Sequence, residues 1–138
     1  MEEVRKDFQG IQLKEKELFE YLISCCYPDL VMARSKMSRW DCYSPDTYHR
    51  IELKCRATHY DELIIEKKKY DAMIENCNDN LDIPFYINST PLGIYRWNLY
   101  IVKPVWETKY LRKTTEFSNG NRIPKEIAML NVKDAEIL

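Results

Sequence analysis

Two segments rich in strand-forming residues flank a short turn in the first half of the chain, and this pattern constrains the fold most. Residues 39–43 and 48–56 are separated by Ser44-Pro45-Asp46-Thr47. Serine, proline and aspartate favour tight turns, whereas aromatic and β-branched residues favour strands. The sequence therefore predicts a β-hairpin over residues 39–56, with its two strands paired side by side.

The rest of the chain predicts two helices and further strands. Apolar residues recur at helical spacing over 11–26 and 60–76, and short apolar runs at 30–33, 83–87, 94–102 and 127–132 are typical of strands. Residues 103–124 are polar and are expected to be irregular. The element order predicts one α/β (α+β) domain over residues 1–138, with a mixed central sheet flanked by helices and extra C-terminal strands.

Composition excludes several classes of protein. With 45% hydrophobic and 31% charged residues among 138, the chain has enough apolar material for a core and is neither disordered nor collagen-like. No apolar run approaches the ~20 residues that span a bilayer, and we expect no membrane partner. The five cysteines include no Cys-x-x-Cys pair. Their odd number indicates free thiols in a reducing compartment, and hence the cytoplasm.

The charged side chains of the predicted hairpin point to a reaction. Glu52 and Lys54 are two residues apart on a strand and so share a face, and the hairpin brings Asp41 opposite Glu52. Carboxylates are hard ligands for Mg²⁺, which activates a bound water and offsets charge at a phosphoryl group. A nearby lysine orients that water, stabilises the transition state or accepts a proton. The trio fits phosphodiester hydrolysis, and its alternative is a solvated strand face with a salt bridge.

The same residues resemble a known motif. A tryptophan-aspartate pair at 40–41, a turn, and Ile51-Glu52-Leu53-Lys54 are similar to the PD-(D/E)xK motif of restriction-endonuclease-like nucleases. Asp41 stands at the motif aspartate, although tryptophan replaces the usual proline before it. The family core order, α-β-β-β-α-β, also matches over roughly residues 10–90. The resemblance therefore implies a restriction-endonuclease-like fold.

The resemblance also implies an activity and a metal site. It implies a Mg²⁺-dependent DNA endonuclease, with Mn²⁺ as a substitute, similar to the small phage and Holliday-junction-resolvase-like members. Asp41, Glu52 and the Leu53 carbonyl would hold the metal, and Lys54 would position or activate the water. Small members of the family often dimerise, so the resemblance further implies a homodimer that acts on DNA.

A glutamate of the first predicted helix is a further catalytic candidate. Many resolvase-like members add such a residue to the site. Glu15 falls at the centre of the apolar face of the helix, whereas Glu17 and Glu20 point away from it. A carboxylate on an apolar stripe is costly unless it is paired or metal-bound. We therefore choose Glu15, and the alternative is a helix end where its carboxylate reaches water.

Charge is distributed unevenly along the chain, although its net value is -1. Residues 34–69 carry a net charge of +3 and residues 96–125 carry +5, and the flanking segments are acidic. Basic groups that contact phosphates dominate binding to DNA. The predicted nucleic-acid-binding residues in these blocks are Arg39, Arg56, Lys69, Arg112 and Lys113. Lysines on helices are more often simply solvated. The aromatic residues between positions 97 and 110 either stack on bases or pack in the core.

Two other functions fit the same fold. One is a non-catalytic nucleic-acid-binding module, and the other is a phage protein-interaction module. The complete set of Asp41, Glu52 and Lys54 argues against both, because no structural role requires three converging charges. Hydrolysis of DNA is therefore the function that the sequence favours.

Overall fold

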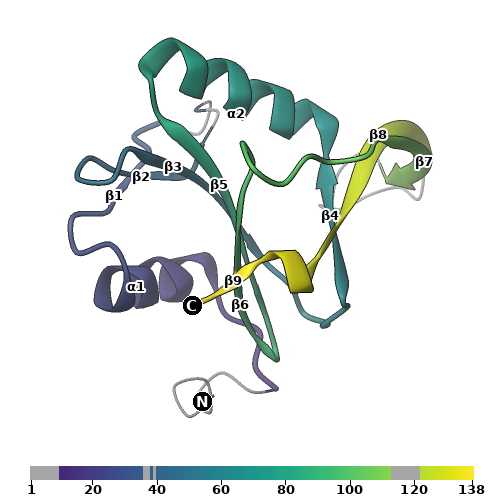
Figure 1. The fold of residues 1–138 in the computed structure, drawn as a ribbon. Helices are drawn as coiled ribbons and strands as arrows, with labels where there is room; N and C mark the ends of the chain where they lie inside the picture. The colour runs from purple at the N-terminus through teal and green to yellow at the C-terminus, as the bar shows by residue number, and fades with distance from the viewer. Residues whose placement is uncertain (1–9, 36–37, 39, 113–121) are drawn as a thin grey trace.

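The computed structural model describes residues 10–35, 38, 40–112 and 122–138 (Figure 1). Two helices, nine strands and a short 3-10 helix occupy these residues. In chain order they are α1 (Glu15–Cys25), β1 (Val31–Met32), β2 (Cys42–Ser44), β3 (His49–Cys55), β4 (Glu62–Glu66), α2 (Lys67–Asn80), β5 (Ile83–Thr90), β6 (Gly93–Asn98), β7 (Glu107–Arg112), β8 (Arg122–Asn131), η2 (Val132–Asp134) and β9 (Glu136–Ile137). No helix among these residues is both long and apolar enough to cross a membrane.

A six-stranded mixed sheet in the order β1-β2-β3-β5-β6-β9 forms the centre of the molecule. The predicted hairpin is present as β2 and β3, with Cys42 opposite Ile51. β3 and β5 are parallel, and every other neighbouring pair in this sheet is antiparallel. The predicted mixed α+β class is therefore confirmed. The expected order α-β-β-β-α-β is present with one additional strand, β4, before α2.

The two faces of this sheet are covered differently. On one face, Leu18 and Leu22 of α1 pack against Ile51 and Leu53 of β3. On the other face, α2 and the second sheet pack over an aromatic layer that includes Trp97. Because side chains alternate along a strand, the residues of β3 between and beyond the two apolar ones point to the α2 side. Burial of Ile51 and Leu53 therefore places Glu52 and Lys54 on the opposite face from α1.

A three-stranded sheet in the order β4-β8-β7, which we call the arm, extends from the α2 side (Figure 1). The fully buried Trp97 joins it to the main sheet, since its indole Nε1 donates to the Asn131 carbonyl over 3.0 Å. The expectation that residues 103–124 are irregular is wrong at both ends, where β7 and the start of β8 pair. Most side chains of β7 are exposed, so the segment lacks the apolar alternation that indicates a strand.

Both helices begin later than the apolar periodicity predicts. The predicted helix over 60–76 is a strand, β4, over its first part, because Ile64 and Ile65 pair with β8 instead of continuing a helix. β-branched residues favour such pairing. α1 begins at Glu15, where the carboxylate of Glu17 accepts a 2.8 Å hydrogen bond from the Lys14 backbone N–H. That contact caps the helix and leaves Ile11 outside it.

Candidate active site

The hairpin brings Asp41 beside Glu52. The backbone N–H of Asp41 donates to the Ile51 carbonyl over 2.8 Å, which continues the β2–β3 pairing by one residue. The Asp41 carboxylate then accepts a 2.7 Å hydrogen bond from the Leu53 backbone N–H. Asp41 is therefore held against the strand that carries Glu52, as the sequence predicts. The Leu53 side chain is buried on the α1 side, so only its backbone belongs to this site.

Glu52 is a nearly buried carboxylate with a cation beside it. Its side chain is 10% exposed, and its Oε2 accepts a 2.8 Å hydrogen bond from the Lys69 ammonium of α2. Burial and the negative charge of Asp41 raise the pKa of Glu52 to about 7, although Lys69 acts in the opposite direction. Two carboxylates this close in a poorly hydrated place favour a cation between them.

In the structure, the Lys69 ammonium supplies a positive charge beside these carboxylates. Burial lowers the pKa of its ammonium, but the hydrogen bond and charge of Glu52, followed by the charge of Asp41, leave it raised overall. The side chain remains 54% exposed, so it reaches Glu52 from the solvent side. Lys69 is therefore a neighbour of both carboxylates and is not a merely solvated helix residue.

Lys54 lies on the same face of β3 as Glu52, one alternation further along the strand. Burial lowers the pKa of its ammonium, and the positive charges of Arg56 and Lys69 lower it further. The charges of Glu52 and Glu66 oppose this effect. A lysine in such surroundings releases a proton more readily than one in water, which suits a group that acts on a nucleophilic water.

Glu15 is the first residue of α1, and its side chain is exposed instead of lying within the apolar face. Partial burial and the charge of Asp41 nevertheless raise the pKa of Glu15, while Lys69 lowers it. The Asp41 charge also acts on Glu52. Glu15 therefore lies within electrostatic reach of Asp41, at a helix end that borders the site.

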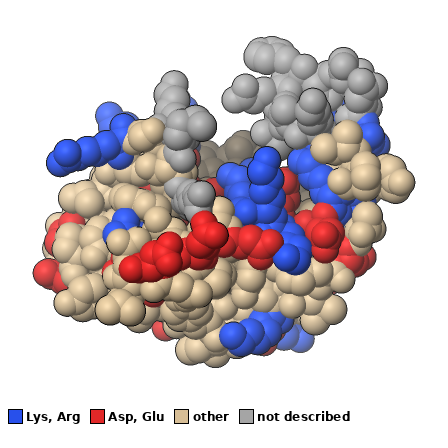
Figure 2. Space-filling view, turned by 90° about the horizontal axis from the view of Figure 1, so that it is seen from above, with Lys and Arg blue, Asp and Glu red and all other residues tan. Residues whose placement is uncertain are grey.

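The β3 side of the site opens into a cavity of about 340 Å³ between the main sheet and the arm. Its charged lining is mostly basic, with Lys54, Arg56, Lys69, Arg112, Arg122 and Lys125 against Glu52 and Glu66. Figure 2 shows basic side chains gathered beside a hollow, with acidic side chains next to them. Three of the predicted nucleic-acid-binding residues, Arg56, Lys69 and Arg112, therefore line the same cavity as Glu52 and Lys54. They come from both basic blocks of the sequence.

Arg56 uses most of its donors within the protein. Its Nε donates to Asn88 over 2.8 Å, and its Nη2 donates to the Ile64 carbonyl over 2.7 Å and to the Tyr86 hydroxyl over 3.1 Å. Arg56 therefore fastens the arm to the main sheet and also lines the cavity. Its partners come from β4 and β5, and no local sequence signal indicated Tyr86 or Asn88 as part of the site.

Two predicted nucleic-acid-binding residues, Arg39 and Lys113, lie outside the described residues. Both adjoin segments that reach the site, since Trp40 precedes Asp41 and Arg112 lines the cavity. Of the two roles predicted for the aromatic residues between positions 97 and 110, Trp97 packs in the core, where it is fully buried.

The donor set suits a hard divalent cation. Asp41 and Glu52 offer carboxylate oxygens beside each other, and Mg²⁺ in proteins commonly takes one or two carboxylates and keeps several waters. Among the described residues, no three or more His, Cys, Asp or Glu side chains converge as a metal cluster. An ion here would therefore complete its coordination with a backbone carbonyl, for which Leu53 is the candidate, and with water and a phosphate oxygen.

Comparison with known proteins supports the fold. No family model matches the sequence, and no curated protein matches it. The structure matches that of Hjc, a Holliday junction resolvase from the archaeal hyperthermophile Archaeoglobus fulgidus, with a TM-score of 0.52 and 12% sequence identity. The match covers 86% of this chain and 96% of that chain. The chain therefore shares the fold of this resolvase, a mixed α+β fold as the sequence predicts.

Proposed function

We propose that this chain is a single-domain, metal-dependent endonuclease that hydrolyses phosphodiester bonds in DNA. The observation that carries the proposal is that Glu52 and Lys54 line a cavity with a mainly basic lining, while the Asp41 carboxylate is held on the same strand beside Glu52. A protein that only binds DNA needs the basic lining but not two adjacent carboxylates, which repel phosphate. The similarity to a Holliday junction resolvase adds support at the level of the fold.

Each residue of the site has a separate role in the proposed reaction. Asp41, Glu52 and the Leu53 carbonyl would hold Mg²⁺, or Mn²⁺ in its place. The bound metal would lower the pKa of a coordinated water and offset charge on the scissile phosphate. Lys54 orients the attacking water or takes its proton, and Glu15 assists at the border of the site. Lys69, which binds Glu52 in the structure, would exchange this contact for one with a phosphate oxygen.

The basic lining of the cavity positions the DNA backbone. Arg112 and Arg122 of the arm and Lys54 of the main sheet all line the cavity, so a backbone that enters meets cations from both sheets. Such contacts supply affinity that falls with salt and carries no sequence information. We further propose that the protein acts in the cytoplasm as a homodimer, so that two sites meet the two strands.

A plasmid-nicking assay tests the proposal. At matched protein concentrations, wild type and variants are incubated with supercoiled plasmid and with branched DNA in Mg²⁺ or Mn²⁺. Asp41→Asn and Lys54→Met keep the size of each side chain, and we expect each to lower the cleavage rate by a factor on the order of 10² or more. Asp79→Asn and Lys133→Met are the matched controls on exposed positions away from the cavity.

The same assay separates the alternatives. If wild type cuts no DNA with either metal, or if the Asp41 and Lys54 variants cut as fast as their controls, the nuclease proposal is wrong. Binding to the same DNA in Ca²⁺, measured by gel shift, then distinguishes a nucleic-acid-binding module from a protein-interaction module.

A further inference from the structure

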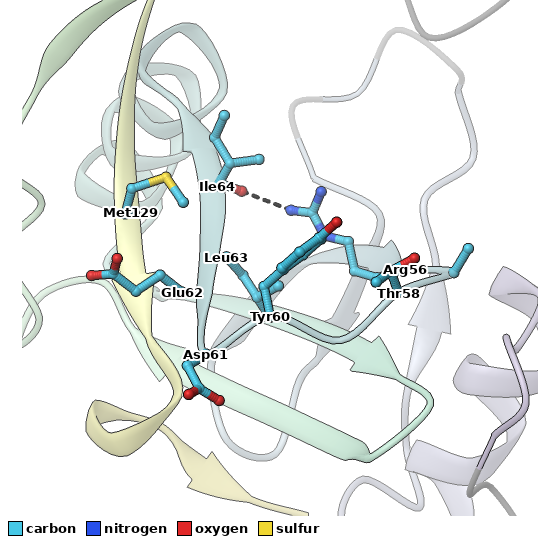
Figure 3. A pocket seen from close by; sticks show the side chains of 9 residues that line it. Arg56, Thr58, Tyr60, Asp61, Glu62, Leu63, Ile64 and Met129 are labelled. Carbon is cyan, nitrogen blue, oxygen red and sulfur yellow. Dashed lines mark hydrogen bonds between the residues drawn. The ribbon is translucent and has the colours of Figure 1, made fainter.

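A second and larger cavity, of about 710 Å³, lies next to the candidate active site. Its walls come from the β3–β4 connection, from β4 itself and from Met129 of β8 (Figure 3). Apolar surface is supplied by Leu63, Ile64, Met129 and the ring of Tyr60. A volume of this size and lining falls in the range of sites for small organic groups.

Arg56 and Ile64 connect the two cavities, because both residues line both of them. Arg56 donates a hydrogen bond to the Ile64 carbonyl at this shared border (Figure 3). The two cavities are therefore adjacent, so a nucleotide next to one whose phosphate lies in the first cavity is close to the second. The second cavity is thus within reach of the nucleotide next to the scissile phosphate, and its ligand need not be a separate molecule.

Tyr60 is available for stacking in that cavity. The residue is 64% exposed, and its ring has no aromatic or hydrogen-bonding partner within the described part of the chain. In Figure 3 the ring is drawn between Leu63 and Arg56. An exposed aromatic ring flanked by apolar side chains and a guanidinium is the arrangement on which nucleobases stack.

The charges around the second cavity select a base over a phosphate. Asp61 and Glu62 line its outer end, and the Asp61 side chain is 86% exposed. These carboxylates repel a phosphodiester but accept hydrogen bonds from the amino groups of a base. Arg56, at the border with the first cavity, is the cation that also lines the second, and the other basic residues line the first cavity. The arrangement therefore places the backbone in one cavity and a base in the other.

From these observations we infer that the second cavity binds an unpaired nucleobase adjacent to the scissile phosphate, stacked on Tyr60. This inference rests on the proposed function and specifies its substrate class, which is DNA with an unpaired nucleotide beside the cut. A base that enters such a cavity must leave the double helix. That step costs least for a base that is already unpaired or mismatched.

Binding measurements in EDTA test the inference without cleavage. The probes are a duplex with one unpaired 2-aminopurine and the same duplex with the 2-aminopurine paired. We expect wild type and Tyr60→Phe to prefer the unpaired probe and to change its fluorescence. We expect Tyr60→Ala to bind the unpaired probe roughly 5- to 150-fold more weakly, the range that corresponds to loss of one base-stacking contact. Its affinity for the paired probe should not change.

The control is Tyr48→Ala, which removes an exposed tyrosine at the other end of β3. It should bind both probes as wild type does. The inference is wrong if Tyr60→Ala binds the unpaired probe as tightly as wild type. It is also wrong if Tyr60→Ala instead changes the oligomeric state in sedimentation, since the cavity would then be an interface between copies. If wild type never cuts DNA but shows a Tyr60-dependent preference for the unpaired probe, the nuclease proposal is wrong and the base-binding cavity is supported.

Discussion

Glu52 is the residue at which the fold and the site conflict most. It lies in the middle of a buried strand, between Ile51 and Leu53, where an apolar side chain would pack without penalty. Its carboxylate is instead nearly buried and faces the charge of Asp41, and both effects raise its pKa to about 7. A charge kept at such a place destabilises the folded chain, which is typical of a residue retained for its chemistry.

The first prediction is that Glu52→Gln stabilises the metal-free protein in a pH-dependent manner. The folded pKa of about 7 lies above the ordinary value of 4.5, so the folded state binds more protons between these values. The stability of wild type therefore falls as the pH rises from 4.5 to 7. The amide variant lacks this loss and should gain about 3 kcal/mol at pH 8 but little at pH 4.5.

Denaturation in urea with EDTA at the two pH values measures this difference. Glu20→Gln, on the exposed side of α1, is the control and should change stability equally at both pH values. An equal effect of Glu52→Gln at pH 4.5 and pH 8 would show that its carboxylate is not perturbed.

The second prediction concerns Arg56, whose guanidinium binds Asn88, Tyr86 and the Ile64 carbonyl. Arg56→Met should lower the free energy of unfolding by about 3 kcal/mol, because it leaves partly buried acceptors without donors. Arg56→Lys should recover only part of the loss, since a single ammonium cannot replace the planar fork. Urea denaturation measures both variants. A variant that loses DNA affinity at unchanged stability would assign Arg56 to DNA alone.

At the residue scale, the sequence predicts what depends on local geometry. Asp41, Glu52 and Lys54 follow from the period of a strand and the register of one hairpin, both of which are written in neighbouring residues. The partners of Arg56 do not follow, because Tyr86 and Asn88 arrive through the parallel pairing of β3 with β5. Glu15 is intermediate, since the sequence offers both the apolar face of the helix and an exposed helix end for its carboxylate, and the structure has the exposed end.

The arm is the element that the sequence predicts least well. Two of its cross-strand pairs join like charges, Lys109 opposite Lys125 and Arg112 opposite Arg122. Like charges directly opposite each other destabilise a pair of strands. Their cost is offset in part at Lys125, which contacts Glu66 of β4 over 3.4 Å. Both arginines line the site cavity, where a bound polyanion would relieve their repulsion.

The third prediction is that Arg112→Ser and Arg122→Ser weaken DNA binding through its electrostatic part. Each variant should lower the slope of log affinity against log salt by about 1, and the effect should be the same for different DNA sequences. Neither should lower stability, because each removes one half of a repulsive pair. Fluorescence anisotropy over a salt series provides the measurement. Lys133→Ser, outside the cavity, is the control, and an unchanged slope in both arginine variants would exclude the arm from the DNA interface.

The start of the arm shows why its elements are hard to predict. The segment that begins β4 also fits a helix by its apolar spacing, and the outcome is decided by pairing with β8, more than 60 residues later. β7 carries almost no apolar alternation because it packs against little. Tertiary pairing overrides local preference at both places. The paired β2–β3 segment, in contrast, contains its own turn and its own register.

At the scale of the whole molecule, the site depends on both layers of the core. The layer around α1 fixes β3 through Ile51 and Leu53, and the layer around Trp97 fixes the arm against the main sheet. The strand that carries Glu52 and pairs with the Asp41 segment is fixed by the first layer. Most of the basic residues that line the cavity belong to elements of the second layer. The cavity therefore exists only when both layers are packed, which no local sequence pattern expresses.

The fourth prediction follows from that dependence and concerns metal binding. Asp41 and Glu52 meet only in the folded chain, so Mg²⁺ should bind the folded state and stabilise it by about 2.7 kcal/mol at 100 times its dissociation constant. Asp41→Asn and Glu52→Gln should abolish this increment, whereas Lys54→Met, which removes no proposed ligand, should keep it while losing cleavage. Thermal unfolding in EDTA and in a Mg²⁺ series measures the increment. An equal increment in Asp41→Asn would place the metal elsewhere and separate the carboxylates from the role proposed for them.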